Sequence, residues 1–157
     1  MPAIHIRRLE PGDVPDVAAL LEQLARTSIT GEFSPLAQEK FLRSNDAAAI
    51  HGFIAHGFQC WVAESNQAII GFVGVRDNSH LYHLFVAEPF QRQGIARQLW
   101  RVAQEACQAA GNPGRFTVNS SNNAVAFYES LGFRRSHPMQ DSDGVLYNPM
   151  IMEIPLT

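Results

Sequence analysis

Residues 84–96 read LFVAEPFQRQGIA: an apolar run, a short polar loop, and a glycine followed two positions later by a small residue. The apolar run is typical of a strand end, and the residues from about Gly94 onward have the apolar spacing of a long helix. Several backbone N–H groups at such a helix start have no intrahelical partner, and the helix dipole adds partial positive charge. Gly94 and Ala96 leave this surface bare, and Arg92 adds a full charge. The stretch is neither a Walker loop nor a GxGxxG fingerprint. It suits a pyrophosphate that is held rather than transferred, unless Gly94 only permits a turn and Ala96 only packs.

The segments on either side predict an α/β chain, strictly a mixed α+β one. Upstream, we expect a strand over 4–9, helices over about 13–31, 34–43 and 45–57, and strands over 59–64, 68–76 and 81–86. Downstream, we expect a helix over about 94–111, a strand over 116–119, a helix over 122–131, a strand over 133–135, a turn over 141–144 and a strand over 145–154. The helix between strands 81–86 and 116–119 implies a parallel pair with a right-handed crossover, whereas the short hairpins imply antiparallel neighbours.

Composition excludes several classes of protein. The chain has 157 residues, of which 46% are apolar and 17% charged, so we expect one globular domain over 1–157. A net charge of −3 gives no electrostatic case for nucleic-acid binding. No apolar run approaches the ~20 residues of a membrane helix, and we expect no signal peptide. The two cysteines have no zinc-ligand spacing, so we expect no metal and a reducing, cytoplasmic setting.

Two blocks of sequence resemble one known family. The pattern Gln91-x-x-Gly94-x-Ala96 is similar to the Q/R-x-x-G-x-G/A signature of the GCN5-related N-acetyltransferases (GNAT). Residues 119–133, NSSNNAVAFYESLGF, resemble that family's N-…-A-x-x-F/L-Y-x-x-x-G-F segment, and the order of elements matches over nearly the whole chain. The resemblance implies a central mixed sheet, mostly antiparallel, with flanking helices. It also implies that strands 81–86 and 116–119 splay apart, with the pantetheine arm of acetyl-CoA between them.

The resemblance assigns the donor site position by position. It places the pantetheine against the strand backbone and the pyrophosphate in the loop that opens the long helix. Many family members carry Asn where this chain has Ser121, and Asn119 or Asn122 is expected to take over that contact. The residues expected to bind the acetyl-CoA co-substrate are Phe85, Val86, Gln91, Arg92, Gln93, Gly94, Ile95, Ala96, Asn119 and Asn122.

Tyr128 falls at the position of the family's usual general acid. A tyrosine has a pKa of ~10 and a thiol one of ~8.5, so a phenol is protonated near neutral pH and can give its proton to a departing thiolate. From spacing alone Tyr128 is also compatible with a core position. His83 is the expected general base, with His80 and Glu64 as alternatives, although packing or solvation explains each of these residues too. A backbone N–H near Val86 is the expected oxyanion donor.

The predicted function is therefore acetyl transfer from acetyl-CoA to a primary amine. The acceptor is a small molecule or a peptide, held by residues within about 27–58 and 137–147. We expect no nucleic-acid or membrane partner, and a homodimer is compatible with the sequence. Two alternatives stay open at this point: a module of the same fold that binds acyl-CoA without turnover, and a transferase for a longer acyl group.

Overall fold

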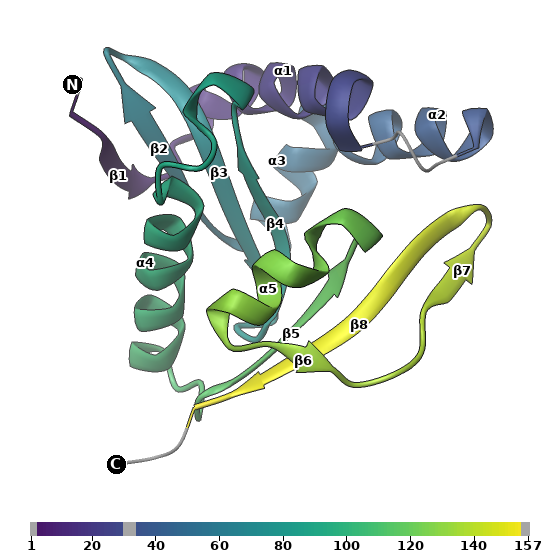
Figure 1. The fold of residues 1–157 in the computed structure, drawn as a ribbon. Coiled ribbons are helices and arrows are strands. Elements are labelled where there is room, and N and C mark those ends of the chain that lie inside the picture. Colours follow the sequence, from purple (N-terminus) through teal and green to yellow (C-terminus); the bar gives the residue numbers. More distant parts are fainter. Residues whose placement is uncertain (1–2, 30–33, 155–157) are drawn as a thin grey trace.

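The computed structural model describes residues 3–29 and 34–154, which form an open mixed sheet with helices on both faces (Figure 1). The sheet order is β1-β2-β3-β4-β5-β8-β6, and β7 pairs with β8 outside this path. The strands are β1 His5–Arg8, β2 Gln59–Ser65, β3 Ala68–Arg76, β4 His80–Val86, β5 Arg115–Ser120, β6 Arg134–Arg135, β7 Gln140–Ser142 and β8 Val145–Glu153. The helices are α1 Val14–Leu24, extended by a π-helical turn over Ala25–Ile29, then α2 Pro35–Ser44, α3 Ala47–Ala55, α4 Ile95–Ala109 and α5 Val125–Leu131.

The predicted fold class is confirmed: the sheet is antiparallel except for the parallel pair β4–β5. The side chain of Ser34 caps α2, because it accepts a hydrogen bond from the backbone N–H of Ala37. Helix α3 begins later than predicted, because the carboxylate of Asp46 caps it by accepting from the backbone N–H of Ala49 at 2.9 Å. The expected end of the first helical region at Gly31 lies outside the described residues.

One strand is absent from the prediction. Residues 141–144 were expected to form a turn, but Gln140–Ser142 form β7, and the turn itself is confined to Asp143 and Gly144. Strand β7 is short, polar and exposed, so its sequence has no alternation of apolar and polar residues to reveal it.

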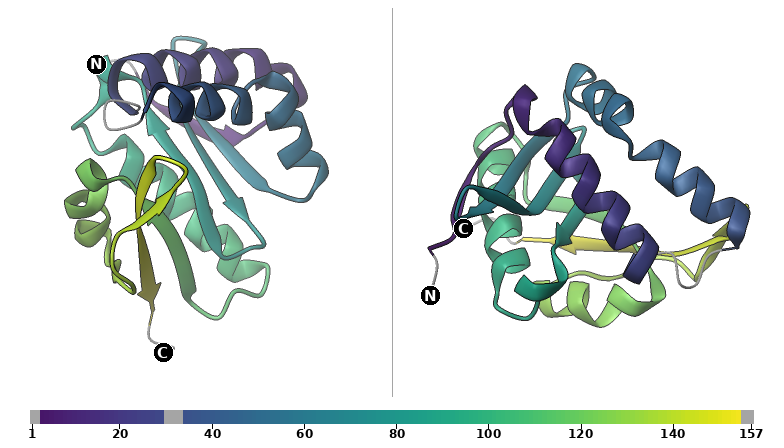
Figure 2. Two further views of the ribbon diagram at one scale, coloured as in Figure 1. Left: turned by 90° about the vertical axis from the view of Figure 1, so that its right-hand side faces the viewer. Right: turned by 90° about the horizontal axis from the view of Figure 1, so that it is seen from above.

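Two apolar cores hold the helices to the sheet. Helix α4 packs Leu99 and Ala103 into one core, together with Phe116 of β5. Helices α1 and α3 pack Leu21 and Ile50 into the other. Figure 2 shows α1 and α2 on the side of the sheet away from α4. The sheet is therefore anchored on both faces, which fixes the strands that carry the site.

The parallel pair β4–β5 is short, and this is the feature that creates the site. Pairing is confined to His80 with Thr117 and Leu81 with Val118, although β4 runs on to Val86 and β5 to Ser120. The register of β3 against β4 also shifts at this point, because Val75 pairs with Leu81 and Gly74 with His83, leaving Tyr82 as an inserted residue. Such a bulge bends a strand. Beyond it, β4 and β5 diverge (Figure 1).

Candidate active site

A groove with a cavity volume of about 690 Å³ lies along the diverging strands. It is lined by parts of α2, β4, the end of β5, the segment leading into α5, and the β7–β8 hairpin. Of the residues predicted from sequence, the groove brings together Tyr128, His83, the alternative base His80, Phe85 and Asn119. Val86, the loop 91–96 and Asn122 are not part of its lining.

Tyr128 enters the groove from α5. Its ring makes edge contacts with Phe127 and Phe133, with ring centroids 5.4 and 5.7 Å apart. Burial raises the pKa of the Tyr128 phenol above its ordinary value of about 10, so the hydroxyl carries its proton at neutral pH. Within the described part of the chain this hydroxyl has no hydrogen-bond partner, and its proton is free for a ligand.

His83 lies on β4 directly after the bulge and is only 2% exposed. Asn45 donates through Nδ2 to the carbonyl of Phe41, so its Oδ1 is the acceptor that faces His83 Nε2 at 2.8 Å. The hydrogen of the neutral ring therefore sits on Nε2. The other nitrogen, Nδ1, is buried without a partner in the described structure, and it lies 3.0 Å from where a Cβ on Gly74 would stand.

Burial lowers the pKa of His83 to about 3, which keeps the imidazole neutral over the ordinary working range. The basic nitrogen faces the neighbouring strand β3, and the nitrogen that faces Asn45 already carries a hydrogen. This environment favours a positioning role, in which His83 ties the end of α2 to β4. The role of general base assigned to His83 from sequence stays a prediction.

The alternative bases are placed differently. His80 lines the groove where the two strands are still paired, and its Nδ1 lies 2.7 Å from the hydroxyl of Thr117. Burial, and then the charge of Arg76, lower the pKa of His80 to about 4. Glu64 is on β2, outside the groove lining, and pairs with Arg7 at 3.1 Å. His80 is therefore neutral at neutral pH, and Glu64 is not placed in the groove.

The predicted phosphate loop lies between the end of β4 and the start of α4. Gln91 donates from Nε2 to the carbonyl of Val86 at 2.9 Å, so its side chain braces the loop on the strand. Gly94 has a φ of +82°, and a Cβ at this position would meet nothing within 4 Å. The helix start is therefore bare at Gly94, and its first backbone N–H groups lack intrahelical partners, as in an anion site.

The two predicted asparagines, at the end of β5 and just after it, have different surroundings. Asn119 lines the groove, together with Ser121 and Asn123, and Asn123 was not among the predicted site residues. Asn122 is held elsewhere, because its Oδ1 accepts a hydrogen bond from Asn148 Nδ2 at 2.8 Å. Asn123 could not be predicted from sequence, because it lies in a run of polar residues where no spacing distinguishes one asparagine from the next.

The far end of the groove closes where α2 meets the β7–β8 turn. Lys40 and Asp143 form an ion pair at 3.5 Å, and a Cβ at Gly144 would stand 2.8 Å from the hydroxyl oxygen of Ser34. The right-hand view in Figure 2, seen from above, shows the tip of the β7–β8 hairpin beside α2. Residues 37–45 and 142–147 supply this part of the lining, within the segments predicted to hold an acceptor.

Comparison with known proteins identifies the class to which this fold and groove correspond. The sequence profile of the family described as Acetyltransferase (GNAT) domain matches residues 27–154. The chain belongs to this family of acetyltransferases.

Among curated proteins, N-acetyltransferase 8 of Homo sapiens is 32% identical over 87 residues, which cover 48% of this chain and 38% of that protein. The probable N-acetyltransferase family 8 member 5 of Mus musculus is 33% identical over 93 residues, or 52% of this chain and 40% of that protein. The chain thus spans less than half the length of these relatives.

Solved structures with the same fold cover nearly the whole chain. A GCN5-related N-acetyltransferase structure from Rhodopseudomonas palustris, described as aminotransferase, class-II, superposes with a TM-score of 0.83 at 20% identity, over 98% of this chain and 96% of that one. The PaiA N-acetyltransferase of Thermoplasma acidophilum, solved in complex with coenzyme A, gives 0.80 at 18% identity, over 97% and 99%.

The described residues contain neither a membrane-spanning helix nor a metal-binding cluster. None of the helices in this part of the chain has both the length and the apolar character of a membrane span. Nor does the same part hold a group of three or more histidine, cysteine or acidic side chains placed to bind a metal.

Proposed function

We propose that this chain transfers the acetyl group of acetyl-CoA to a primary amine by direct attack within a ternary complex, with Tyr128 as the general acid. The observation that carries the proposal is the protonated, unpartnered hydroxyl of Tyr128 in the groove where β4 and β5 diverge. Family membership and the coenzyme A complex of a structural neighbour support acetyl-CoA as the donor.

The donor would lie along the diverging strands. Residues Phe85 and Val86 lie on β4 after its pairing with β5 has ended, so this edge of the strand is open to a pantetheine arm. The first turn of α4 would hold the pyrophosphate through backbone N–H groups, with Arg92 exposed beside it. Asn119, in the groove, is better placed than Asn122 to contact this donor.

The chemical step would begin with attack of the neutral amine nitrogen on the thioester carbonyl. A tetrahedral oxyanion forms, for which a backbone N–H near Val86 is the proposed donor. As the intermediate collapses, the carbon–sulfur bond breaks and Tyr128 gives its proton to the leaving sulfur. The nitrogen loses its proton to solvent, which the buried, neutral state of His83 favours over a histidine base.

Replacing Tyr128 by Phe tests the acid. The variant keeps the ring and its contacts with Phe127 and Phe133 but lacks the proton. We expect turnover at saturating substrate to fall about 10²–10⁴-fold. Affinity for acetyl-CoA, measured by calorimetry, should stay near the parent value.

The same assay separates this function from its rivals. Release of coenzyme A is measured against a panel of amines, with acetyl-CoA and longer acyl-CoA donors in parallel. A folded parent that binds acetyl-CoA and releases nothing with any amine is a binding module, not a transferase. A folded Tyr128→Phe variant with the parent rate, under conditions where chemistry limits turnover, would rule out the acid role.

A further inference from the structure

We propose that the acceptor is a monoamine: a single primary amine on an uncharged, apolar body, without a second charged centre. This inference rests on the proposed acetyl transfer and names the substrate class of the same groove. It follows from two properties of the groove lining, its balance of charge and its aromatic walls.

The first property is the balance of charge among the described residues. At neutral pH the lining contains one cation, Lys40, and one anion, Asp143, and these two solvent-exposed side chains pair with each other at 3.5 Å. The two histidines in the lining are neutral, because burial lowers the pKa of His80 to about 4 and that of His83 to about 3. No unpaired carboxylate in this lining is available to a second ammonium group. A second ammonium group would lose part of its hydration against the apolar lining with no unpaired carboxylate there to offset the loss, so a diamine binds less well than a monoamine of the same length.

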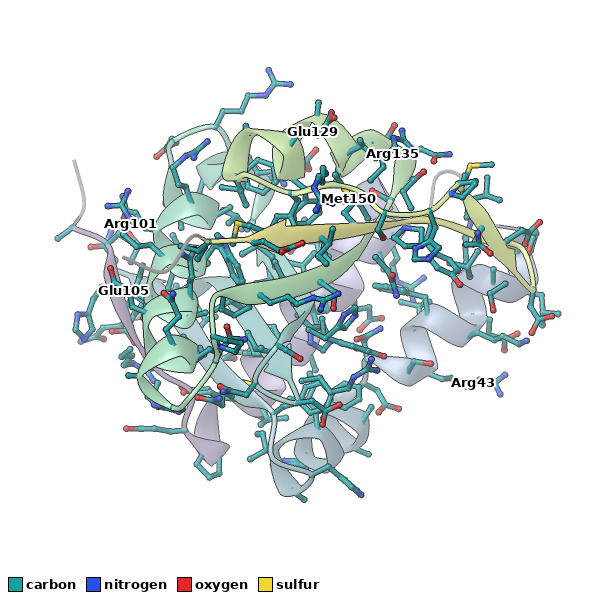
Figure 3. All side chains as sticks on the ribbon, turned by 90° about the horizontal axis from the view of Figure 1, so that it is seen from below. Arg43, Arg101, Glu105, Glu129, Arg135 and Met150 are labelled. Carbon is teal, nitrogen blue, oxygen red and sulfur yellow. The ribbon has the colours of Figure 1, made fainter. Side chains whose placement is uncertain are left out.

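Charges on neighbouring elements do not change this balance. At the end of β3, the guanidinium of Arg76 lies 5.6 Å from the ring of Tyr82, with Asp77 beside it at 3.7 Å. On α2, Glu39 pairs with Arg43 at 2.6 Å, and both belong to a separate depression between the helices rather than to the groove. Figure 3 shows Arg43 projecting outward from α2. Asp77 and Glu39 thus each have a cation beside them, whereas Asp141 on β7 lies outside the groove lining and accepts a hydrogen bond from the backbone N–H of Gly144 at 2.9 Å.

The second property is the aromatic and aliphatic wall. Tyr82, the inserted residue of the β4 bulge, is 38% exposed and lines the groove. Its ring is held by Phe53 and Phe58, with centroids 5.4 Å away in both cases. Leu146 of β8 belongs to the same lining. These side chains offer apolar area to the body of an acceptor, and burial of such area is the main favourable contribution to its binding.

A matched pair of amines tests the proposal. Hexylamine and 1,6-diaminohexane have the same chain, and the diamine differs by one added amino group. We expect the parent protein, with acetyl-CoA saturating, to show a kcat/KM for hexylamine at least about tenfold higher, since 1.4 kcal/mol of unpaired charge corresponds to that factor. For each amine, kcat/KM is expressed relative to the concentration of neutral amino groups, because the diamine carries two amino groups and hexylamine one.

Three variants test whether charge is the cause. Lys40→Met frees the carboxylate of Asp143 within the groove, so the preference for hexylamine should fall at least about threefold. The double variant Lys40→Met, Asp143→Asn removes that carboxylate and should restore the preference. Arg43→Met is the matched control: it frees Glu39 on the same helix but outside the groove, and the preference should not change.

The outcomes distinguish this inference from the proposed function. A kcat/KM for the diamine that equals or exceeds that for hexylamine overturns the monoamine assignment and leaves acetyl transfer intact. A preference that Lys40→Met does not reduce overturns the charge argument. Binding of acetyl-CoA without coenzyme A release for any amine overturns acetyl transfer, and the monoamine assignment with it.

Discussion

At the residue scale, the contacts of His83 decide its protonation. Its Nε2 donates to Asn45, its Nδ1 is buried against Gly74, and no carboxylate lies beside it among its described contacts. A cationic ring would lose its hydration without gaining a counter-ion, which is why burial lowers its pKa to about 3. The free energy of unfolding should report this penalty directly.

We predict that His83 makes the fold acid-sensitive. Between pH 6.5 and about 3 the unfolded chain binds a proton at His83 and the folded chain does not. The folded pKa is depressed, so stability is full above pH 6.5 and is lost as the pH falls, by about 1.4 kcal/mol per pH unit from this group. Urea unfolding from pH 7 to 4 measures it. In His83→Gln and His83→Leu this contribution should vanish, although the absolute stabilities of the two variants will differ. Equal pH slopes in the parent and both variants would contradict the prediction.

At the element scale, the start of α4 is a feature that sequence located well. The change from apolar strand to polar loop to glycine is local, and the apolar spacing of a helix follows it directly. Together these two signals predicted the helix start within one residue of Ile95. Strand β7 was missed because its existence depends on pairing with β8, which no local pattern in Gln140–Ser142 encodes. The bulge at Tyr82 was missed for the same reason, since a bulge is a property of two strands.

The helix start gives a prediction about the donor. Gly94→Asp and Gly94→Asn place side chains of nearly equal size at a φ of +82°, where Asn and Asp are the best tolerated non-glycine residues. Only Asp adds a negative charge to the proposed pyrophosphate site. We expect Gly94→Asp to weaken acetyl-CoA binding at least about tenfold more than Gly94→Asn, measured by calorimetry on folded protein. Added salt should narrow that gap. Equal affinities in the two variants would remove the pyrophosphate from this loop.

At the scale of the whole molecule, the groove is an assembly of segments far apart in the sequence. Tyr128 comes from α5, His83 from β4, Lys40 from α2 and Asp143 from the β7–β8 turn. Sequence motifs pointed to Tyr128 because it lies in a patterned block. They gave no sign that Lys40 would pair with Asp143, about a hundred residues away, or that Asn45 would reach His83. These contacts arise only when α2 packs beside the β4–β5 opening, so the sequence indicated the segments of the acceptor side but not the contacts between them.

This assembly predicts how the rate depends on pH. The histidines of the groove lining stay neutral above pH 5, and burial keeps Tyr128 protonated beyond its ordinary range. With solvent taking the amine's proton, kcat/KM should rise about tenfold per pH unit until the acceptor itself is neutral. For an alkylamine, with a pKa near that of lysine at ~10.4, the rise should continue through pH 9, whereas for the α-amino group of a peptide it should level off near ~7.7–8.0. The inflection therefore follows the acceptor, and His83→Ala should leave its position unchanged.

An inflection near pH 6.5 that is the same for both acceptors and disappears in His83→Ala would instead establish His83 as the general base. Comparing the two acceptors in both proteins separates the alternatives, because changing the amine moves only an inflection that belongs to the amine.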